Sequence, residues 1–344
     1  MRHLGLLLPC TLLFLALIGF SSLTTLAYGQ TKPIELTYST FMPAVQEQGK
    51  LSAEWAKEIE TRTNGRVKIT VFYGGTLTRA DKSYDGVVKG ISDIACSAPS
   101  YTKGKFPLTE AVEQNVGSKS IFMASVVTKM VNEFYNRFKP KEFDDVKVMF
   151  LFCPGGQFLH TKKPVNSLED LKGAKIRSNG VSASTLKALG AVPVVTPMGE
   201  SYETLSRGVA EGVWCPLEAL QSWKLGELVK YSTECFGASN TSSMFVVMNK
   251  DKWNALAPDL QKIIEKVNEE WIERTGRGWE KMDSTARDFL LGTGHKFISL
   301  SEEEQEKWRK GVKPLLDDYT NDMKAKGLPG EEALRFCVDY LKRH

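Results

Sequence analysis

The fold is decided by residues 168–216, which read LEDLKGAKIRSNGVSASTLKALGAVPVVTPMGESYETLSRGVAEGVWCP. A polar loop leads to a short apolar strand that ends at Arg177, and an Asn-Gly turn follows at 179–180. A helix of small residues at about 182–189 and a second buried strand at 192–195 come next. An arginine at the carboxyl end of a strand can reach into a crevice and form a charge-assisted, two-pronged contact with a carboxylate.

The order of strand, helix and strand recurs outside this stretch. Residues 34–39 alternate between apolar and polar, residues 48–61 have helical spacing, and residues 67–72 form a second strand pattern. Residues 146–153, VKVMFLFC, are continuously apolar and predict a strand buried on both faces. This repeated order predicts an α/β fold with right-handed crossovers and mixed, mostly parallel sheets.

The chain has 344 residues, which is too long for one compact core and suits two α/β lobes. We expect lobe I to comprise residues 30–153 and 241–281, and lobe II to comprise residues 154–240 and 282–344. A helical stripe over 259–292 would be on the order of 50 Å long, so we expect one helix to span both lobes.

Two features of the last hundred residues bear on packing. Gly276 and Gly278 lie in the middle of the long helix, where each costs about 1 kcal/mol relative to alanine. They mark either a bend point or a packing constraint. Residues 301–344 contain two amphipathic helical patterns, which we expect to pack on lobe II.

Residues 1–29 have the features of a secretory signal peptide. One basic residue, Arg2, precedes an apolar run over 4–20, and small residues follow up to Gly29. The alternative is an uncleaved membrane anchor, although Pro9 interrupts the run. The signal-peptide interpretation predicts export to the periplasm, and no second apolar span is present in the sequence.

The cysteines indicate no metal site. Five remain after residue 29 and are widely spaced without a Cys-x-x-Cys pair, at Cys96, Cys153, Cys215, Cys235 and Cys337. An odd number without that motif predicts neither a zinc centre nor a complete disulfide framework. One disulfide is possible in an oxidising compartment, but the sequence does not identify the two cysteines that would form it. Otherwise we expect buried free thiols.

Catalytic and cofactor motifs are absent from the sequence, which contains no GxSxG, HExxH, P-loop or GxGxxG. We expect His295, after a glycine-flanked turn, and His344, at the end of the sequence, to be unsuited to the role of a buried base. Cys153 and His160 lack a third group to orient them as a pair. Positive charge is balanced and scattered, with 45 Lys and Arg against 41 Asp and Glu. We therefore expect that the protein is not an enzyme, that it holds no cofactor and that it does not bind nucleic acid.

Three motifs carry a resemblance to a known family. DLKGAKIR at 170–177, LGAVPV at 189–194 and ESYETLSRGVAEG at 200–212, followed by a proline, resemble the DctP-like solute-binding subunits of tripartite ATP-independent periplasmic (TRAP) transporters. The resemblance implies a two-lobed periplasmic-binding-protein-like fold. It also implies a monomer that captures an organic acid between the lobes and delivers it to the membrane subunits of a transporter driven by an ion gradient.

The resemblance assigns a role to Arg177, because the matching arginine of the family binds the ligand carboxylate. From the residues alone, an alternative is a structural arginine that pairs with an acidic neighbour, namely Glu169, Asp170 or Glu200. The resemblance favours ligand contact.

The chain departs from the family at several pocket positions. Gln157 stands where many dicarboxylate and sialate binders have a second arginine, which favours a monocarboxylate. The family asparagine that helps to hold the carboxylate falls on Cys215, and a family glutamate falls on Trp214. Together with Met198, which is often Phe in relatives, these residues predict a more apolar pocket. For Trp214, a core position with an internally satisfied indole is the alternative.

Further pocket candidates come from two loops. Tyr101 and Ser97 lie in a loop that leaves the carboxyl end of a strand, where open α/β sheets bind ligands. A surface packing role is the alternative for Tyr101. Phe158 follows Gln157 and is expected beside it. Trp223, by contrast, is expected in a helix interior with a structural role.

Two other functions remain open. A periplasmic ligand-binding partner of a sensor receptor would share every residue named above. A secreted enzyme is disfavoured, because the sequence offers no acid-base pair. Aliphatic hydroxy or keto acids and aromatic acids all suit a site with one arginine.

Overall fold

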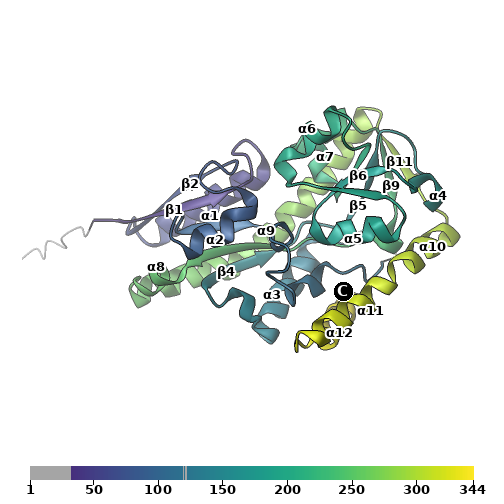
Figure 1. Cartoon of the computed structure of the whole chain (residues 1–344). Coiled ribbons are helices and arrows are strands. Elements are labelled where there is room, and N and C mark those ends of the chain that lie inside the picture. Colours follow the sequence, from purple (N-terminus) through teal and green to yellow (C-terminus); the bar gives the residue numbers. More distant parts are fainter. Residues whose placement is uncertain (1–31, 119, 121) are drawn as a thin grey trace, which may run out of the picture. The chain divides into compact units, whose positions relative to one another are not determined.

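The computed structural model describes residues 32–118, 120 and 122–344 (Figure 1). The predicted signal peptide at 1–29 lies outside these residues. Residues from Pro33 to His344 form one unit, which contains two sheets.

The first sheet has five strands in the order β2-β1-β3-β10-β4. Its strands are β1 (Ile34–Thr40), β2 (Val67–Phe72), β3 (Ile94–Ser97), β4 (Val146–Phe152) and β10 (Met244–Asn249). β1 runs parallel to β2 and β3, whereas β10 runs antiparallel to β3 and β4, so the sheet is mixed. The accompanying helices are α1 (Glu47–Arg62), α2 (Ser83–Val88), α3 (Ala124–Phe138) and α8 (Lys250–Asn254).

The second sheet has six strands in the order β11-β9-β5-β8-β6-β7. Its strands are β5 (Gln157–Thr161), β6 (Lys175–Ser178), β7 (Val192–Val195), β8 (Gly212–Pro216), β9 (Tyr231–Glu234) and β11 (Lys296–Ser299). The helices that follow its strands are α4 (Leu168–Leu171), α5 (Gly180–Ala188), α6 (Ser201–Ser206), α7 (Glu218–Ser222) and α10 (Glu302–Val312).

The chain passes between the two sheets twice in short connecting segments. Residues 153–156 connect β4 to β5, and residues 235–243 return the chain from β9 to β10. Because β10 pairs between β3 and β4, the return strand lies in the middle of the first sheet. The exact lobe boundaries expected from the sequence remain a prediction.

Helix α9 (Pro258–Gly292) contacts elements of both sheets (Figure 1). Its first half packs Leu260 and Trp271 into the core of the first sheet, and its end packs Ala286 and Leu290 into the core of the second. The predicted long helix that spans both halves is therefore confirmed. A Cβ at Gly276 would lie 2.7 Å from the Cα of Ser125 on α3, which supports the packing constraint and not the bend.

The last helices differ from the prediction. Trp308 and Val312 of α10 belong to the second core, as expected. In contrast, α12 (Gly330–Arg343) packs on α3 in a core of the first sheet, and α11 (Pro314–Ala325) contributes Tyr319 and Met323 to that core but also contacts α5 of the second half. The hydroxyl of Tyr319 donates to the carbonyl oxygen of Leu108 at 3.1 Å. The expectation that the C-terminal helical patterns pack on lobe II holds for α10 and is wrong for α12, because an amphipathic pattern does not specify which apolar surface it covers.

Cys96, Cys153, Cys215, Cys235 and Cys337 are all buried as free thiols. None of the described residues form a group of three or more His, Cys, Asp or Glu that could hold a metal ion. Among the helices described between residues 32 and 344, none has both the length and the apolar character required to cross a bilayer.

Candidate functional site

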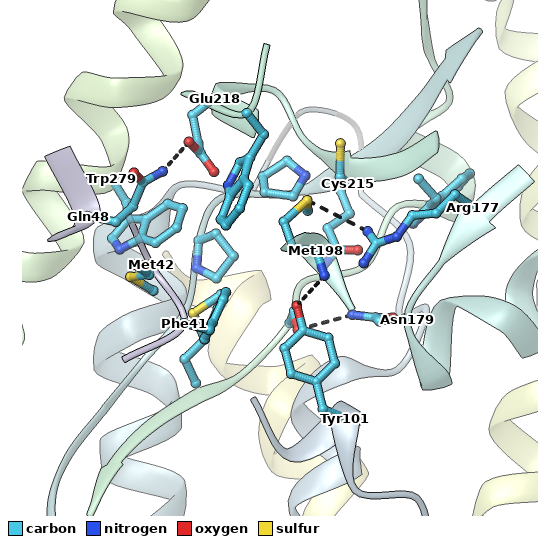
Figure 2. Close-up of a pocket in the computed structure, with 17 residues that line it drawn as sticks. Phe41, Met42, Gln48, Tyr101, Arg177, Asn179, Met198, Cys215, Glu218 and Trp279 are labelled. Atoms are coloured by element: carbon cyan, nitrogen blue, oxygen red, sulfur yellow. Dashed lines mark hydrogen bonds between the residues drawn. The ribbon is translucent and has the colours of Figure 1, made fainter. Parts of the chain in front are cut away.

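A narrow pocket lies between the two sheets (Figure 2). The first-sheet half contributes Phe41 and Met42 after β1, Gln48 from α1, and Tyr101 from a short helical turn, Pro99–Tyr101. The second-sheet half contributes Gln157, Arg177, Asn179, Met198, Trp214, Cys215, Pro216, Glu218 and Trp223; Pro154, Ser242 and Met244 come from the connecting segments and β10, and Trp279 comes from α9. The free space is about 30 Å³, which is room for only a few water molecules.

Strand ends explain why these residues meet. Phe41 and Met42 follow the carboxyl end of β1, Asn179 follows the end of β6, and Pro216 ends β8. In open α/β sheets, the crevice beyond the carboxyl ends of parallel strands is the usual ligand site. The pocket occupies this position in both halves.

Arg177 is buried, with 2% of its surface exposed. Its Nη2 donates to the carbonyl oxygen of Thr196, its Nε to the Thr196 hydroxyl at 3.4 Å, and its Nη1 to the Met198 sulfur at 3.8 Å. All these acceptors are uncharged. In the described part of the chain, no ion pair within 4.0 Å involves Arg177. A buried charge without an opposite charge is costly, so this guanidinium is poised to bind an anion.

The acidic residues considered as structural partners of Arg177 are engaged elsewhere. Glu169 pairs with Lys172 at 2.6 Å, and Glu200 pairs with Arg79 at 3.2 Å. Asp170 forms the capping box of α4 with Ser167. The structural pairing that the sequence left open is not formed.

Tyr101 joins the two halves of the pocket. Its hydroxyl oxygen accepts a hydrogen bond from the backbone N–H of Met198 at 3.3 Å (Figure 2). Its ring meets that of Phe41 edge-on, with centroids 5.6 Å apart. Burial raises the pKa of Tyr101, so the phenol keeps its proton and can donate to a ligand. Tyr101 is thus a pocket wall residue and not a surface packing residue.

Uncharged polar groups lie beside Arg177. The side-chain oxygen of Gln157 accepts from the Ser182 hydroxyl at 3.2 Å. Asn179 caps α5 by accepting from the Ser182 N–H, and its Nδ2 donates to the Ser242 hydroxyl at 3.3 Å. Because Gln157 is neutral, Arg177 is the single cation among the residues that line the pocket.

Trp214 and Cys215 are both fully buried and both line the pocket. The indole N–H of Trp214 donates to the side-chain oxygen of Asn240 at 2.9 Å. Trp214 therefore also has the internal hydrogen bond that the alternative, a core tryptophan, requires. Burial raises the pKa of the Cys215 thiol, which remains protonated and weakly polar. The wall is therefore more apolar here than an amide and a carboxylate would make it.

Two expected residues lie away from the pocket. Phe158 points to the opposite face of β5 from Gln157, into the core of the second half, because side chains alternate along a strand. The hydroxyl of Ser97 donates to the carbonyl oxygen of Ala80 at 2.7 Å and is buried behind the pocket wall. The expectation that they line the pocket is wrong.

Three aromatic pocket residues were not predicted from the sequence. Trp223 lies just after α7, not in a helix interior, and its ring stacks on Phe41 with centroids 6.5 Å apart. Trp223 also packs against both cores, so the structural role expected for it holds beside its place in the pocket wall. Trp279 comes from α9, where the sequence shows only a helical core stripe. The position of Phe41 after a strand end was the one signal that could have identified it.

A neutral acid lies on the far side of the pocket from Arg177 in Figure 2. Glu218 is 3% exposed, and burial raises its pKa to about 8. Its Oε2 accepts from Gln48 Nε2 and from the Ser222 hydroxyl, the latter at 2.6 Å. Its backbone N–H donates to Asp283 at 2.9 Å. At neutral pH, Glu218 therefore keeps its proton and adds no charge to the pocket.

None of the histidines in the described residues lines the pocket. His160 Nδ1 and His295 Nε2 each lie 2.7 Å from the hydroxyl of Ser232. Burial lowers the pKa of His160 to about 3 and that of His295 to about 4. His295 is buried, although the turn before it suggested an exposed position. Both rings are neutral and serve as packing groups.

The fold and the pocket define the class: a periplasmic binding protein with two α/β halves and a long helix that contacts both. The family model for bacterial extracellular solute-binding proteins, family 7 (DctP), matches residues 38–322. The chain belongs to this family, which comprises TRAP solute-binding proteins and not enzymes. The resemblance seen in the sequence is confirmed.

Similar proteins bind diverse carboxylates, and three solved structures among them hold aromatic acids. A TRAP protein of Bordetella bronchiseptica with bound (R)- and (S)-mandelate is 29% identical, has a TM-score of 0.82, and covers 90% of this chain and 99% of its own. A marine metagenome protein specific for aromatic acids, with metahydroxyphenylacetate, is 27% identical, with a TM-score of 0.84 and coverage of 90% and 99%. A protein of Rhodoferax ferrireducens with copurified benzoate is 26% identical, with a TM-score of 0.84 and coverage of 90% and 98%.

Proposed function

We propose that this protein captures an aromatic monocarboxylate in the pocket between its two halves and delivers it to the membrane subunits of a TRAP transporter. The observation that carries the proposal is the buried guanidinium of Arg177, whose described hydrogen-bond partners are all uncharged. A ligand carboxylate would supply the missing negative charge. Each hydrogen bond to a charged group contributes about 1.5–3 kcal/mol.

The charge of the pocket favours one carboxylate over two. Arg177 is its single cation, and Gln157 offers hydrogen bonds but no charge. At the other side, Glu218 would have to stay protonated beside a second carboxylate, because two like charges in a buried site repel strongly.

The pocket walls favour a ring. Five aromatic side chains line the space, namely Phe41, Tyr101, Trp214, Trp223 and Trp279. Aromatic pairs gain about 0.5–1.5 kcal/mol beyond the burial of their area. Similar proteins hold benzoate, mandelate and metahydroxyphenylacetate, which is consistent with this preference.

Ligand entry requires the halves to separate, because the free space of about 30 Å³ is too small for a benzoate. The contact between Tyr101 and Met198 would open and then re-form over the ligand. The closed, ligand-bound form would be the one that docks on the membrane subunits, which in this family use an ion gradient. Export through the signal peptide at 1–29 would place the protein in the periplasm.

A thermal-shift screen of organic acids, followed by calorimetry, tests the proposal. A ligand that binds only the folded state adds about 2.7 kcal/mol of stability at one hundred times its Kd. We expect aromatic monocarboxylates to raise the melting temperature of the wild type, and Arg177→Ala to abolish binding with the fold intact. The matched control is Arg207→Ala, which removes an arginine that is 72% exposed and should change nothing. Unchanged affinity of Arg177→Ala would refute the carboxylate role.

A further inference from the structure

Gln48 lines the pocket, a second internal space beside it and an outer groove, and its side chain carries an unsatisfied acceptor. The residue is 3% exposed and lines the pocket, and its Oε1 is buried without a hydrogen-bond partner among the described residues. A buried carbonyl oxygen without a donor costs about 1–3 kcal/mol. A ligand group that donates a hydrogen bond would remove this cost.

Glu218 offers the complementary donor next to it. Its Oε2 already accepts from Gln48 Nε2 and from the Ser222 hydroxyl, whereas no hydrogen bond within the described residues involves its Oε1. A carboxylic acid whose one oxygen accepts two hydrogen bonds carries its proton on the other oxygen. We therefore assign the proton of neutral Glu218 to Oε1, the oxygen without a described partner.

The Gln48–Glu218 pair closes one end of the pocket. In Figure 2 the pair lies on the left and Arg177 on the right, with Met198 and Cys215 between them. The same two residues also line an outer groove, together with Val45, Gln221 and Lys281. The pair is thus a polar wall between the pocket and the outside, at the end remote from the cation.

We propose that Gln48 and Glu218 determine specificity for a hydroxyl group at the end of the ligand remote from its carboxylate. A hydroxyl can donate to Gln48 Oε1 and, with the same oxygen, accept the proton of Glu218 Oε1. A hydrogen atom or a methyl group at that position satisfies neither, and a second carboxylate cannot donate. The inference rests on the proposed function and narrows its ligand class to hydroxylated aromatic monocarboxylic acids.

Matched pairs of acids test this inference by calorimetry. Benzoate, phenylacetate and mandelate are each compared with their 3-hydroxy and 4-hydroxy ring derivatives. For at least one pair, the wild type should bind the hydroxylated acid more tightly, on the order of tenfold or more, because two hydrogen bonds to buried groups are gained. Gln48→Leu and Glu218→Leu should each bring this ratio close to one, whatever their effect on the affinity for the plain acid.

Two variants complete the design. Glu218→Gln keeps an acceptor and a donor at the same places and should retain most of the preference. Gln221→Leu, on α7 in the outer groove and outside the pocket lining, is the matched control and should leave the ratio unchanged. Gln48 and Glu218 lie on different halves, so a folding defect in one variant leaves the other as a test.

The outcomes separate the two proposals. If the wild type binds plain and hydroxylated acids equally, or if both leucine variants keep the preference, the role of Gln48 and Glu218 is refuted while acid binding stands. If no acid binds, or if Arg177→Ala binds like the wild type, the proposed function itself fails and the inference falls with it.

Discussion

Arg177 and Glu218 are both buried in one pocket, but Arg177 is charged and Glu218 is neutral. Arg177 carries a positive charge among uncharged acceptors. Glu218 avoids the same cost by keeping its proton, since burial raises its pKa to about 8. The result is a pocket with one positive end and one neutral, hydrogen-bonding end.

A second buried acid leads to a prediction about pH. Glu113 accepts from the N–H and hydroxyl of Ser243, at the connection between the sheets, and burial raises its pKa to about 8. The folded state therefore binds more protons than the unfolded state between the ordinary pKa and about 8. This contribution is fully present at low pH and is lost as pH rises through 8.

We expect the free energy of unfolding of the wild type to fall by about 2 kcal/mol between pH 6 and pH 9 through Glu113 alone. Glu113→Gln removes this titration, so its denaturation curves should depend less on pH over the same range. The comparison is made by urea denaturation at each pH. Equal pH dependence of the two proteins would show that Glu113 does not carry the effect.

At the scale of elements, the packing of α9 on α3 leads to another prediction. Gly276→Ala should destabilise the protein by about 1–3 kcal/mol, because the new Cβ would lie 2.7 Å from the backbone of Ser125 and force the helices apart. Gly292→Ala, at the end of the same helix, meets nothing within 4 Å and should be neutral or stabilising by up to about 1 kcal/mol. Thermal denaturation compares them; equal stability would contradict the packing role of Gly276.

Local periodicity predicted most of the elements. The strand pattern at 67–72 coincides with β2, the one at 192–195 with β7, and the helical stripe at 259–292 with α9 to within one residue. These patterns succeed because each depends only on neighbours along the chain. The resemblance added the pocket position of Arg177, which periodicity alone left open.

The errors concern contacts between distant segments. Neighbouring side chains of β5 lie on opposite faces, so Phe158 points away from the pocket because Gln157 faces it. The sequence does not determine which face of the strand meets the pocket. Trp223 reaches the pocket because α7 ends at Ser222, before the tryptophan. Gln48 reaches the pocket from α1 and bonds to Glu218 on the other half. The sequence around Gln48 gives no indication that it is a pocket residue.

At the scale of the whole molecule, the two halves are held together by connections and by contacts across the pocket. The chain crosses twice between the sheets, and α9 packs on both. Tyr101 with Met198, and Gln48 with Glu218, form hydrogen bonds between the halves at the pocket itself. A ligand that replaces or adds to these contacts would favour the closed form, which is how binding could be reported to a membrane partner.

The most direct measurement is a crystal structure of the protein with a bound aromatic acid. We expect a ligand carboxylate within hydrogen-bond distance of the Arg177 guanidinium, about 2.7–2.9 Å, with the ring between the aromatic walls. A ligand bound elsewhere, with Arg177 still hydrogen-bonded only to Thr196 and Met198, would contradict it.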